Sequence, residues 1–387
     1  MSVRLTTAGL FAGIGGIELG LERAGHSTVF ASEIEPGARA VFGARFPHVP
    51  LAGDIREIEE LPAVDIVAGG FPCQDLSQAG RTAGITGRNS GLVDEVFRLV
   101  ARMGRGPTWL LLENVPFMLQ LGRGGAMGYV TYRLEEAGFR WAYRVIDNRA
   151  FGLPQRRLRV IILASRSEDP TEVLFHDNEV EPDPADPEGV ACGFYWTEGI
   201  RGLGWAVDAV PTLKGGSTIG IPSAPAIRMP DGSIVTPALQ DAERLQGFDA
   251  DWTEPALRET PRVGHRWKLV GNAVSVPMAT WVGRRLGDPR PYAGGHDERF
   301  LRNGAWPRAA WNDGSDVRVS RVSSWPVRQP YRHLVEFLRF EPNPLSARAA
   351  QGFLNRAARS SLRFPPGLLD DVRVHLESMR EPSLFAA

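Results

Sequence analysis

The sequence predicts an α/β protein with a doubly wound, mostly parallel sheet. Three observations lead to this fold class. Strand-like and helix-like segments alternate through the first 165 residues, the strands are short apolar runs, and a glycine-rich turn joins the first strand to the first helix. Such alternation is typical of parallel sheets, because a parallel pair of strands needs a crossover connection, which is usually a helix.

The first segments follow one another in a regular order. Strands are predicted over residues 5–11, 28–31, 65–68, 109–112, 139–145 and 160–164. Helices are predicted over residues 17–24 and 37–46, each directly after one of the first two strands. This order is the basis for the predicted sheet.

The pattern changes after residue 168. Residues 169–237 are rich in Gly, Pro and acidic residues and predict an irregular insertion, which a helix over residues 239–245 follows. Residues 288–314 are loop-like, and the segment 331–380 is largely helical. The sequence therefore predicts a small irregular domain and a helical C-terminal extension in addition to the sheet.

Composition excludes several classes of protein. The 387 residues contain 44 Lys and Arg against 45 Asp and Glu, so any nucleic-acid site must be a local basic face on a nearly neutral protein. Cys73 and Cys192 are too few for a disulfide framework, and the seven His show no ligand spacing, so no metal site is expected. With no signal peptide and no bilayer-spanning apolar run, we expect a cytoplasmic protein without a membrane partner.

Three acidic or glycine-rich positions follow the first strands. Residues 10–16 (LFAGIGG) form a glycine turn between a strand and a helix, which lets a ligand approach the backbone at the helix N-terminus. Glu33 ends the second strand and can accept hydrogen bonds from ribose hydroxyls, and Asp54 can accept one from an adenine amino group. Together they indicate a nucleoside site, although a tight turn beside two solvated acids has the same pattern.

Two further strands end in residues that suit catalysis. Cys73 follows the strand over residues 65–68, where a thiolate can act as a nucleophile, although a lone Cys can also be a small buried residue. Glu113 follows the strand over residues 109–112, where partial burial suits a carboxyl to proton donation, or where it caps a helix. Arg157 and Arg159 alternate with Arg156 and Leu158 just before the strand over residues 160–164. If the strand begins here, the two arginines point to one side; the alternative is a solvated basic run.

In this combination and order, the motifs resemble the DNA (cytosine-5)-methyltransferase family. The resemblance covers roughly residues 4–287. The matching blocks are FAGIGG (residues 11–16), Pro72-Cys73-Gln74, Glu113-Asn114-Val115, Gln155 with Arg157 and Arg159, ERLQGF (residues 243–248) and GNAVS (residues 271–275). The resemblance implies a Rossmann-like methyltransferase fold, S-adenosyl-L-methionine as methyl donor and a base flipped out of double-stranded DNA.

The resemblance also implies the catalytic roles. Cys73 matches the nucleophile that adds to carbon 6 of cytosine and makes carbon 5 able to attack the methyl group. Glu113 matches the group that neutralises charge at ring nitrogen 3. Arg159 matches the arginine at the cytosine carbonyl oxygen, with Arg157 bracing the site. The sequence does not identify the base that removes the proton from carbon 5.

A cofactor pocket is implied in the same way. Its expected residues are Phe11, Gly13, Gly15, Glu33, Ile34, Asp54, Ile55, Gly70, Pro72, Leu92, Asn272 and Val274. Two positions depart from the family pattern. Gly9 stands where an Asp often precedes the Leu-Phe pair, and Ile34 stands where a Trp often follows the ribose-binding Glu. Both departures could weaken cofactor binding without changing the reaction.

The same resemblance predicts the domain organisation. Residues 1–165 and 237–287 are expected to form the catalytic and cofactor-binding domain, residues 166–236 to read the DNA sequence, and residues 288–387 to be an extension of unassigned role. The candidate DNA contacts in the reading region are Trp196, Arg201, Trp205, Lys214, Gly215-Gly216-Ser217 and Arg228.

The C-terminal extension leaves two interpretations open. It contains 15 Arg against 11 Asp and Glu, which suits a module that binds DNA or a partner. It can equally be a helical appendage packed on the catalytic domain. Its three tryptophans, Trp306, Trp311 and Trp325, are expected in the core and not as platforms for base stacking.

Three functions are compatible with these patterns. The first is a DNA cytosine-5 methyltransferase of a bacterial restriction–modification or phage-defence system, whose partners would include a cognate restriction endonuclease or defence proteins. The second is an RNA methyltransferase of the same family that acts on tRNA with the same Cys and Glu. The third is a non-enzymatic DNA-binding module, which the intact Cys73, Glu113 and Arg159 argue against.

Overall fold

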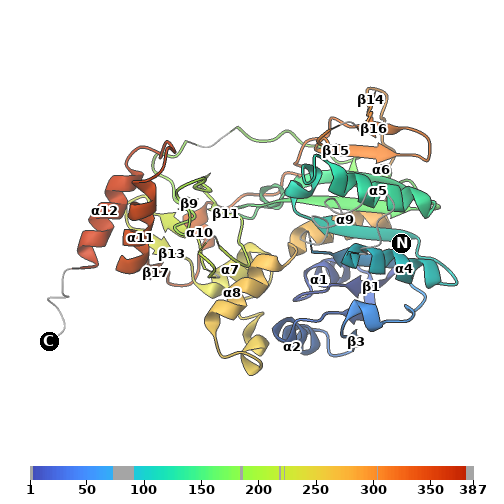
Figure 1. Cartoon of the computed structure of the whole chain (residues 1–387), viewed down its shortest axis with the longest axis horizontal. Coiled ribbons are helices and arrows are strands. Elements are labelled where there is room, and N and C mark those ends of the chain that lie inside the picture. Colours follow the sequence, from blue (N-terminus) through green and yellow to red (C-terminus); the bar gives the residue numbers. More distant parts are fainter. Residues whose placement is uncertain are drawn as a thin grey trace. The chain divides into compact units, whose positions relative to one another are not determined.

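The computed structural model describes residues 3–72, 91–183, 186–217, 219–221, 223–302 and 304–380. The chain divides into two compact units, whose elements are labelled in Figure 1. The first unit comprises Met1–Phe151, Leu158–Glu181 and Ala273–Gln329. The second unit comprises Gly152–Arg157, Pro182–Asn272 and Pro330–Ala387.

Within its described residues, the first unit contains a ten-stranded sheet with the order β14-β16-β15-β6-β8-β5-β4-β1-β2-β3. The strands are β1 (Thr6–Leu10), β2 (Ser27–Ser32), β3 (Leu51–Ala52), β4 (Ile66–Gly70), β5 (Trp109–Asn114), β6 (Arg140–Asp147), β8 (Leu158–Ser165), β14 (Glu298–Arg299), β15 (Ala309–Asn312) and β16 (Val317–Val319). Strands β1 to β5 pair in parallel, and β8 is antiparallel to both β5 and β6. The predicted fold class, a mostly parallel sheet of the Rossmann-like type, is confirmed.

Helices cover both faces of this sheet (Figure 1). They are α1 (Gly16–Arg23), α2 (Pro36–Arg45), α4 (Leu92–Arg102), α5 (Gly125–Glu136), α6 (Pro170–Leu174) and α9 (Val276–Gly287). Apolar residues of α1, α6 and α9 pack in one buried cluster, and those of α4 and α5 pack in another. Alternate residues of a strand point into the two clusters, so in β4 Val67 lies in one and Ile66 in the other.

The order of the strands predicts where this unit binds a ligand. Strand β1 lies between β2 and β4 in the sheet. From β1 the chain builds outward to β2 and β3, and then returns to β4 on the opposite side of β1. In doubly wound sheets, ligands bind outside the carboxyl ends of the strands at such a switch point. The turns after β1 and β4 are therefore the expected walls of a site.

The second unit is smaller and less regular. Its described strands form a five-stranded antiparallel sheet, β10-β9-β12-β13-β17, and a pair, β11-β7. The strands are β7 (Gln155–Arg156), β9 (Cys192–Phe194), β10 (Ala206–Val207), β11 (Val210–Pro211), β12 (Ala226–Arg228), β13 (Ile234–Thr236) and β17 (Asn343–Pro344). The helices are α7 (Leu239–Leu245), α8 (Val263–Asn272), α10 (Leu334–Phe337), α11 (Ala347–Ala357) and α12 (Leu368–Ser378).

Most predicted elements are confirmed, with ends shifted by a few residues. The six strands predicted before residue 165 correspond to β1, β2, β4, β5, β6 and β8, and the helix predicted over residues 239–245 is α7. The segment 331–380 is helical at α10, α11 and α12, as expected. The loop-like prediction for residues 288–314 is wrong in part, because β15 lies there and pairs antiparallel with β6.

The C-terminal hundred residues contribute to both units. Residues up to Gln329 belong to the first unit and add β14, β15 and β16 to its sheet. Residues from Pro330 onward belong to the second unit, where α11 and α12 pack against each other and against strands of the small sheet. The extension therefore supplies core residues to two cores.

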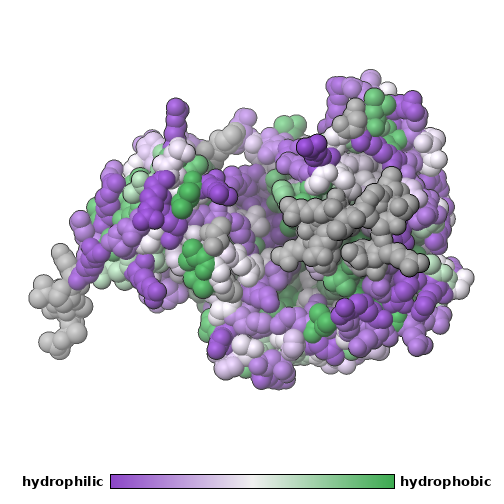
Figure 2. Space-filling model, in the orientation of Figure 1, coloured by the Kyte–Doolittle hydropathy of each residue, from purple (hydrophilic) through white to green (hydrophobic). Residues whose placement is uncertain are grey.

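The surface agrees with a protein whose apolar side chains are clustered inside. On the face drawn in Figure 2, hydrophilic residues predominate and hydrophobic ones are scattered among them. None of the helices in the described part of the chain is long and apolar enough to cross a membrane.

Candidate active site

The chain leaves β1 through a tight turn that opens α1. Phe11, Gly13 and Gly15 have positive φ angles of 54°, 57° and 85°, a region that glycine adopts without strain. A Cβ on Gly13 would meet no atom within 4 Å, so there is open space over the turn. Gly15 caps α1 without a side-chain hydrogen bond, so no side chain covers the N–H groups of the first turn from this position. The turn can therefore accept a ligand at the start of a helix.

Glu33 follows β2 and holds the turn in place. Its Oε2 accepts a hydrogen bond of 2.7 Å from the backbone N–H of Gly13. Its Oε1 accepts hydrogen bonds of 2.9 and 2.8 Å from the N–H groups of Ile34 and Glu35. These donors fix the carboxylate beside the turn, at the place predicted for ribose binding. Ile34, which stands where the family often has a Trp, is 61% exposed.

Asp54 lies after β3, before a short 3-10 helix that begins at Ile55. Its carboxylate accepts a hydrogen bond from the N–H of Arg56 and forms an ion pair with the Arg56 guanidinium. The hydrogen bonds from Arg56 hold the pKa of Asp54 below its usual value. Asp54 is therefore ionised at neutral pH, and the side chain of Ile55, the next residue, is buried.

Two glycines, Gly16 and Gly70, allow close contact between the segments that surround the expected site. A Cβ on Gly16 would lie 2.3 Å from the carbonyl oxygen of Val274, so the start of α1 touches the segment before α9. A Cβ on Gly70, at the end of β4, would lie 3.1 Å from Oε2 of Glu113 and 3.5 Å from Cγ2 of Val274. Gly70, Glu113 and Val274 therefore converge at the switch point. Of the other predicted pocket residues, Leu92 is half-buried at the start of α4 and Pro72 is exposed after β4.

The predicted catalytic acid is paired with the predicted arginine. Glu113 is in β5, and Arg159 is in β8, which runs antiparallel beside it. The Nε of Arg159 lies 2.8 Å from Oε1 of Glu113, with side chains only 9% and 11% exposed. Arg159 also donates through Nη1 to the carbonyl oxygen of Leu158. The pair offers a donor and a carboxyl side by side at the carboxyl edge of the sheet.

Asn114 connects this pair to the end of β4. Its Nδ2 donates a 3.0 Å hydrogen bond to the carbonyl oxygen of Phe71, and its Oδ1 accepts one from the N–H of Val115. The amide thus fixes the chain that leads out of β4. The predicted nucleophile, Cys73, lies outside the described residues, which end at Pro72 on this side and resume at residue 91.

Two predicted site residues belong to the second unit. Arg157 is fully buried, and its guanidinium donates to the carbonyl oxygens of Leu213 and Gly271. Asn272 ends α8, one residue after Gly271. The structure therefore brings Arg157 and Asn272 close to each other, and Arg157 holds backbone of its own unit together.

Several predicted DNA contacts have partners within the second unit. Lys214 pairs with Glu198 at 2.5 Å and lies 3.7 Å from the centre of the Tyr195 ring. Arg228 pairs with Asp371 at 2.5 Å. The indole N–H of Trp196 donates to a backbone carbonyl oxygen at 2.9 Å. These side chains stabilise the unit, whereas Arg201 is exposed.

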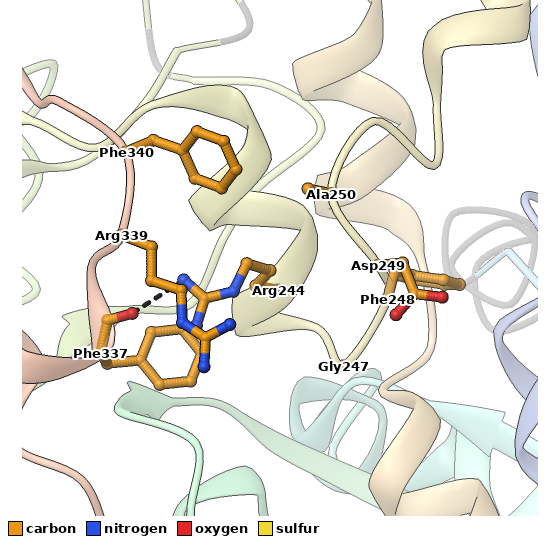
Figure 3. Close-up of a pocket in the computed structure, with 8 residues that line it drawn as sticks. All are labelled: Arg244, Gly247, Phe248, Asp249, Ala250, Phe337, Arg339 and Phe340. Carbon is orange, nitrogen blue, oxygen red and sulfur yellow. Dashed lines mark hydrogen bonds between the residues drawn. The ribbon is translucent and has the colours of Figure 1, made fainter.

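The second unit also has a pocket of about 360 Å³, shown in Figure 3. It is lined by Arg244, Gly247, Phe248, Asp249, Ala250, Phe337, Arg339 and Phe340. The Arg244 guanidinium lies 4.6 Å from the centre of the Phe337 ring and donates to the Phe337 carbonyl oxygen at 2.8 Å. The same guanidinium pairs with buried Asp241. The motif at residues 243–248 is thus joined to the C-terminal segment through the contacts of Arg244 with Phe337.

Comparison with known proteins identifies the family. A family model described as C-5 cytosine-specific DNA methylase matches residues 5–189. The Type II methyltransferase M2.BsuMI of Bacillus subtilis (strain 168) is 49% identical over 360 residues, which cover 90% of this chain and 92% of the relative. The chain belongs to the C-5 cytosine-specific DNA methylase family.

Other relatives agree with this membership. The Type II methyltransferase M.NgoBI of Neisseria gonorrhoeae is 30% identical over 299 residues, which cover 70% of this chain and 90% of that protein. The crystal structure of the Dnmt2 methyltransferase of S. pombe superposes with a TM-score of 0.54 and covers 73% of this chain and 98% of that one. Because the sequence identity is only 17%, this likeness supports the fold alone. The methylase is a DNA (cytosine-5-)-methyltransferase, as the motifs predicted.

Two buried residues near the predicted site of the methylase were not assigned roles from the sequence. Asn114 stood in a matching block, but its bond to Phe71 joins segments 43 residues apart and has no local signal. Glu18 lies in the first turn of α1 and is 1% exposed. An acid in the first turn of a helix is ordinarily read as a solvated residue that favours the helix dipole, so its burial could not be expected from the sequence.

Proposed function

We propose that the methylase transfers the methyl group of S-adenosyl-L-methionine to a flipped-out cytosine in double-stranded DNA, through a covalent Cys73 adduct. The observation that supports this most is the buried Glu113–Arg159 pair at the carboxyl edge of the sheet. Gly70 lies close to both Glu113 and Val274, and Val274 lies close to Gly16 at the end of the glycine turn. A base and a methyl donor bound at these two places would therefore be neighbours.

The residues around the turn fit the proposed donor. There is open space over Gly13, and the Glu33 carboxylate beside it retains lone pairs for ribose hydroxyls. Asp54 is held ionised and can accept from an amino group of the base. When bound, S-adenosyl-L-methionine supplies an electrophilic methyl group. The chain's own residues bind the nucleoside part.

The reaction at the cytosine is assigned to three residues. The Cys73 thiolate forms a bond to carbon 6, which makes carbon 5 nucleophilic. Glu113 neutralises the charge that develops at ring nitrogen 3, and Arg159 donates to the carbonyl oxygen, which also selects for cytosine. After methyl transfer a base removes the proton from carbon 5, the electron pair returns to the ring and the Cys73–carbon 6 bond breaks. Arg157 is assigned the bracing role that the motif implies; within the second unit its guanidinium donates to the carbonyl oxygens of Leu213 and Gly271.

Reading of the DNA sequence is assigned to residues 166–236, most of which lie in the second unit. Residues 1–165 and 237–287 are proposed to form the catalytic part. Because Lys214, Arg228 and Trp196 have internal partners, exposed Arg201 is the strongest remaining candidate for a DNA contact. The Type II methyltransferases among the relatives support a role in a restriction–modification or phage-defence system, with a cognate endonuclease or defence proteins as partners.

One experiment tests the substrate and the site together. The methylase is expressed in a host without cytosine methylation, and 5-methylcytosine is mapped at base resolution in DNA and in tRNA. A single methylated DNA motif supports the proposal, and the Cys73→Ala variant, expressed to the same level, should leave that motif unmethylated. Methylation confined to tRNA would assign the enzyme to the RNA-modifying branch instead.

A further inference from the structure

Glu18 is a buried acid beneath the glycine turn that the proposed reaction does not use. It lies in the first turn of α1 and is 1% exposed. Its carboxyl occupies the space that Gly9 leaves free in β1, because a Cβ on Gly9 would lie only 2.1 Å from Oε1 of Glu18. The carboxyl therefore reaches from the helix back to the strand, two residues before the turn begins at Phe11.

One oxygen of this carboxyl lacks a donor. Among the residues that the structure describes, Oε2 of Glu18 has no hydrogen-bond partner, although it is fully buried. Buried polar atoms in folded proteins are nearly always hydrogen-bonded, and an isolated buried carboxylate is costly. Oε2 can therefore accept a hydrogen bond from an N–H donor that reaches the space beneath the turn.

The surroundings favour a positive charge. The charged groups that act on Glu18 are Glu22, one turn further along α1, and Glu33 after β2. On α9, which packs against α1, the charged residues are Arg284 and Arg285, both in the last turn of that helix. Burial, reinforced by the two acids, raises the pKa of Glu18 to about 8.

We propose that the Glu18 carboxyl positions the methyl donor by accepting a hydrogen bond from the positively charged amino group of its methionine part. This inference rests on S-adenosyl-L-methionine being the donor. It assigns Glu33 and Asp54 to the nucleoside part and Glu18 to the amino-acid part. Binding of the ammonium group would give Oε2 its donor and would stabilise the ionised carboxyl.

Comparing the binding of two ligands distinguishes the nucleoside part of the site from the amino-acid part. S-adenosyl-L-methionine contains both parts, whereas 5′-methylthioadenosine keeps the nucleoside and lacks the amino-acid part. Calorimetry should show that Glu18→Gln weakens binding of the first ligand and leaves that of the second within twofold. Glu33→Ala should weaken both. Equal binding of S-adenosyl-L-methionine by wild type and Glu18→Gln would overturn the inference.

The expected size of the effect follows from the charge. A charge-assisted hydrogen bond corresponds to roughly 10- to 150-fold in affinity. With a pKa of about 8, only about a quarter of Glu18 is ionised at pH 7.5 in the free protein, which reduces this advantage by about fourfold. At pH 7.5 the Glu18→Gln variant should therefore bind S-adenosyl-L-methionine about 3- to 40-fold more weakly.

A neighbouring acid provides the matched control. Glu22 is on the same helix, is 28% exposed in its side chain and lies 3.9 Å from Nε2 of His48. Glu22→Gln makes the same carboxyl-to-amide change on α1 and should leave the affinity within twofold. An equal loss in both variants would show a general charge effect and would overturn the positioning role. No binding by the wild-type protein would instead overturn the proposed donor.

Proton release gives a readout that a purely structural role would not change. At pH 7.0 Glu18 is mostly protonated in the free protein, because its pKa is about 8. An ammonium group that stabilises the carboxylate should expel roughly 0.4 to 0.8 of a proton per ligand, measured by calorimetry in buffers of different ionisation enthalpy. Glu18→Gln should lose this release. The same release in both proteins would refute the assignment.

The space shared by Gly9 and Glu18 allows a rescue experiment. Position 9 often carries an Asp in this family, and Gly9 does not have a positive φ, so an Asp is compatible with its backbone. In a Glu18→Ala background, Gly9→Asp should return a carboxyl to the same space and recover most of the lost affinity. A folded double variant with no recovery would count against the placement.

Discussion

Replacing Trp306 by Ala tests whether the C-terminal residues are part of the catalytic core. Trp306 is 6% exposed and lies in the larger apolar cluster of the first unit. Its ring centre is 5.1 to 6.0 Å from those of Trp141, Tyr143 and Phe300. Its indole N–H donates a buried 3.0 Å hydrogen bond to the carbonyl oxygen of Gly124. The substitution removes these contacts and one of the two donors to that carbonyl, which keeps its hydrogen bond from the Gly128 N–H.

The expected loss is large for one substitution. Truncation of a buried Trp to Ala costs about 3–5 kcal/mol, against a total of about 5–15 kcal/mol for a typical domain. In a unit of roughly 230 residues, each kcal/mol lowers Tm by about 2–4 °C, so Tm should fall by about 6–20 °C. Urea and thermal unfolding, followed by tryptophan fluorescence and circular dichroism, measure both quantities.

Trp311 provides the control for this measurement. It is half-buried on β15, where its indole N–H donates to Asp297 at 2.7 Å, so Trp311→Ala should cost no more than about 1–2 kcal/mol. DNA affinity of the folded Trp306→Ala protein should stay within a few-fold. A variant with unchanged Tm and strongly reduced DNA affinity would refute the reasoning, because Trp306 would then be a base-stacking platform.

The other predictions concern the reaction and the donor. Cys73→Ala should abolish methylation but not donor binding. Wild-type enzyme should form a covalent adduct with duplex DNA containing 5-fluorocytosine, which denaturing gels would show. Absence of this adduct with active enzyme would exclude the covalent route. Glu113→Gln should slow single-turnover methylation by about 10²–10⁴ with DNA affinity within a few-fold, and a near-normal rate would remove Glu113 from the mechanism. Glu33→Ala and Asp54→Ala should each weaken donor binding by about 1.5–3 kcal/mol, and unchanged calorimetric affinities would mean that the nucleoside site lies elsewhere.

Deletion of residues 288–387 is a poor test of their role. It would remove β15 from its pairing with β6 and take Trp306 and Trp325 out of two apolar clusters. It would also strip the buried Arg144 guanidinium of its bond to the Ser323 carbonyl oxygen, at a site where burial already lowers the arginine pKa to about 9. We expect the truncated protein to unfold, so point substitutions are needed to separate folding from DNA binding.

The local order of elements and the identity of the chemical groups could be predicted from the sequence. Apolar runs, glycine turns and helix periodicity are short-range signals, so β1, the turn before Gly16 and α7 lie within a few residues of their expected positions. Glu33 and Glu113 could be placed at strand ends for the same reason. The loop-like interpretation of residues 288–314 failed because β15 is short and is stabilised by pairing with β6, about 170 residues away in the chain.

Only the tertiary structure decided which of these groups meet. Glu113 and Arg159 are adjacent because β8 runs antiparallel to β5, a direction that no local pattern in the sequence specifies. Arg157, two residues before Arg159, belongs to the other unit and holds carbonyl oxygens there. Glu18 is buried because Gly9 leaves room for its carboxyl, which is a matter of packing between a strand and a helix. Sequence patterns report the conformational preference of each segment, whereas pairing, burial and charge contact depend on residues far apart in the chain.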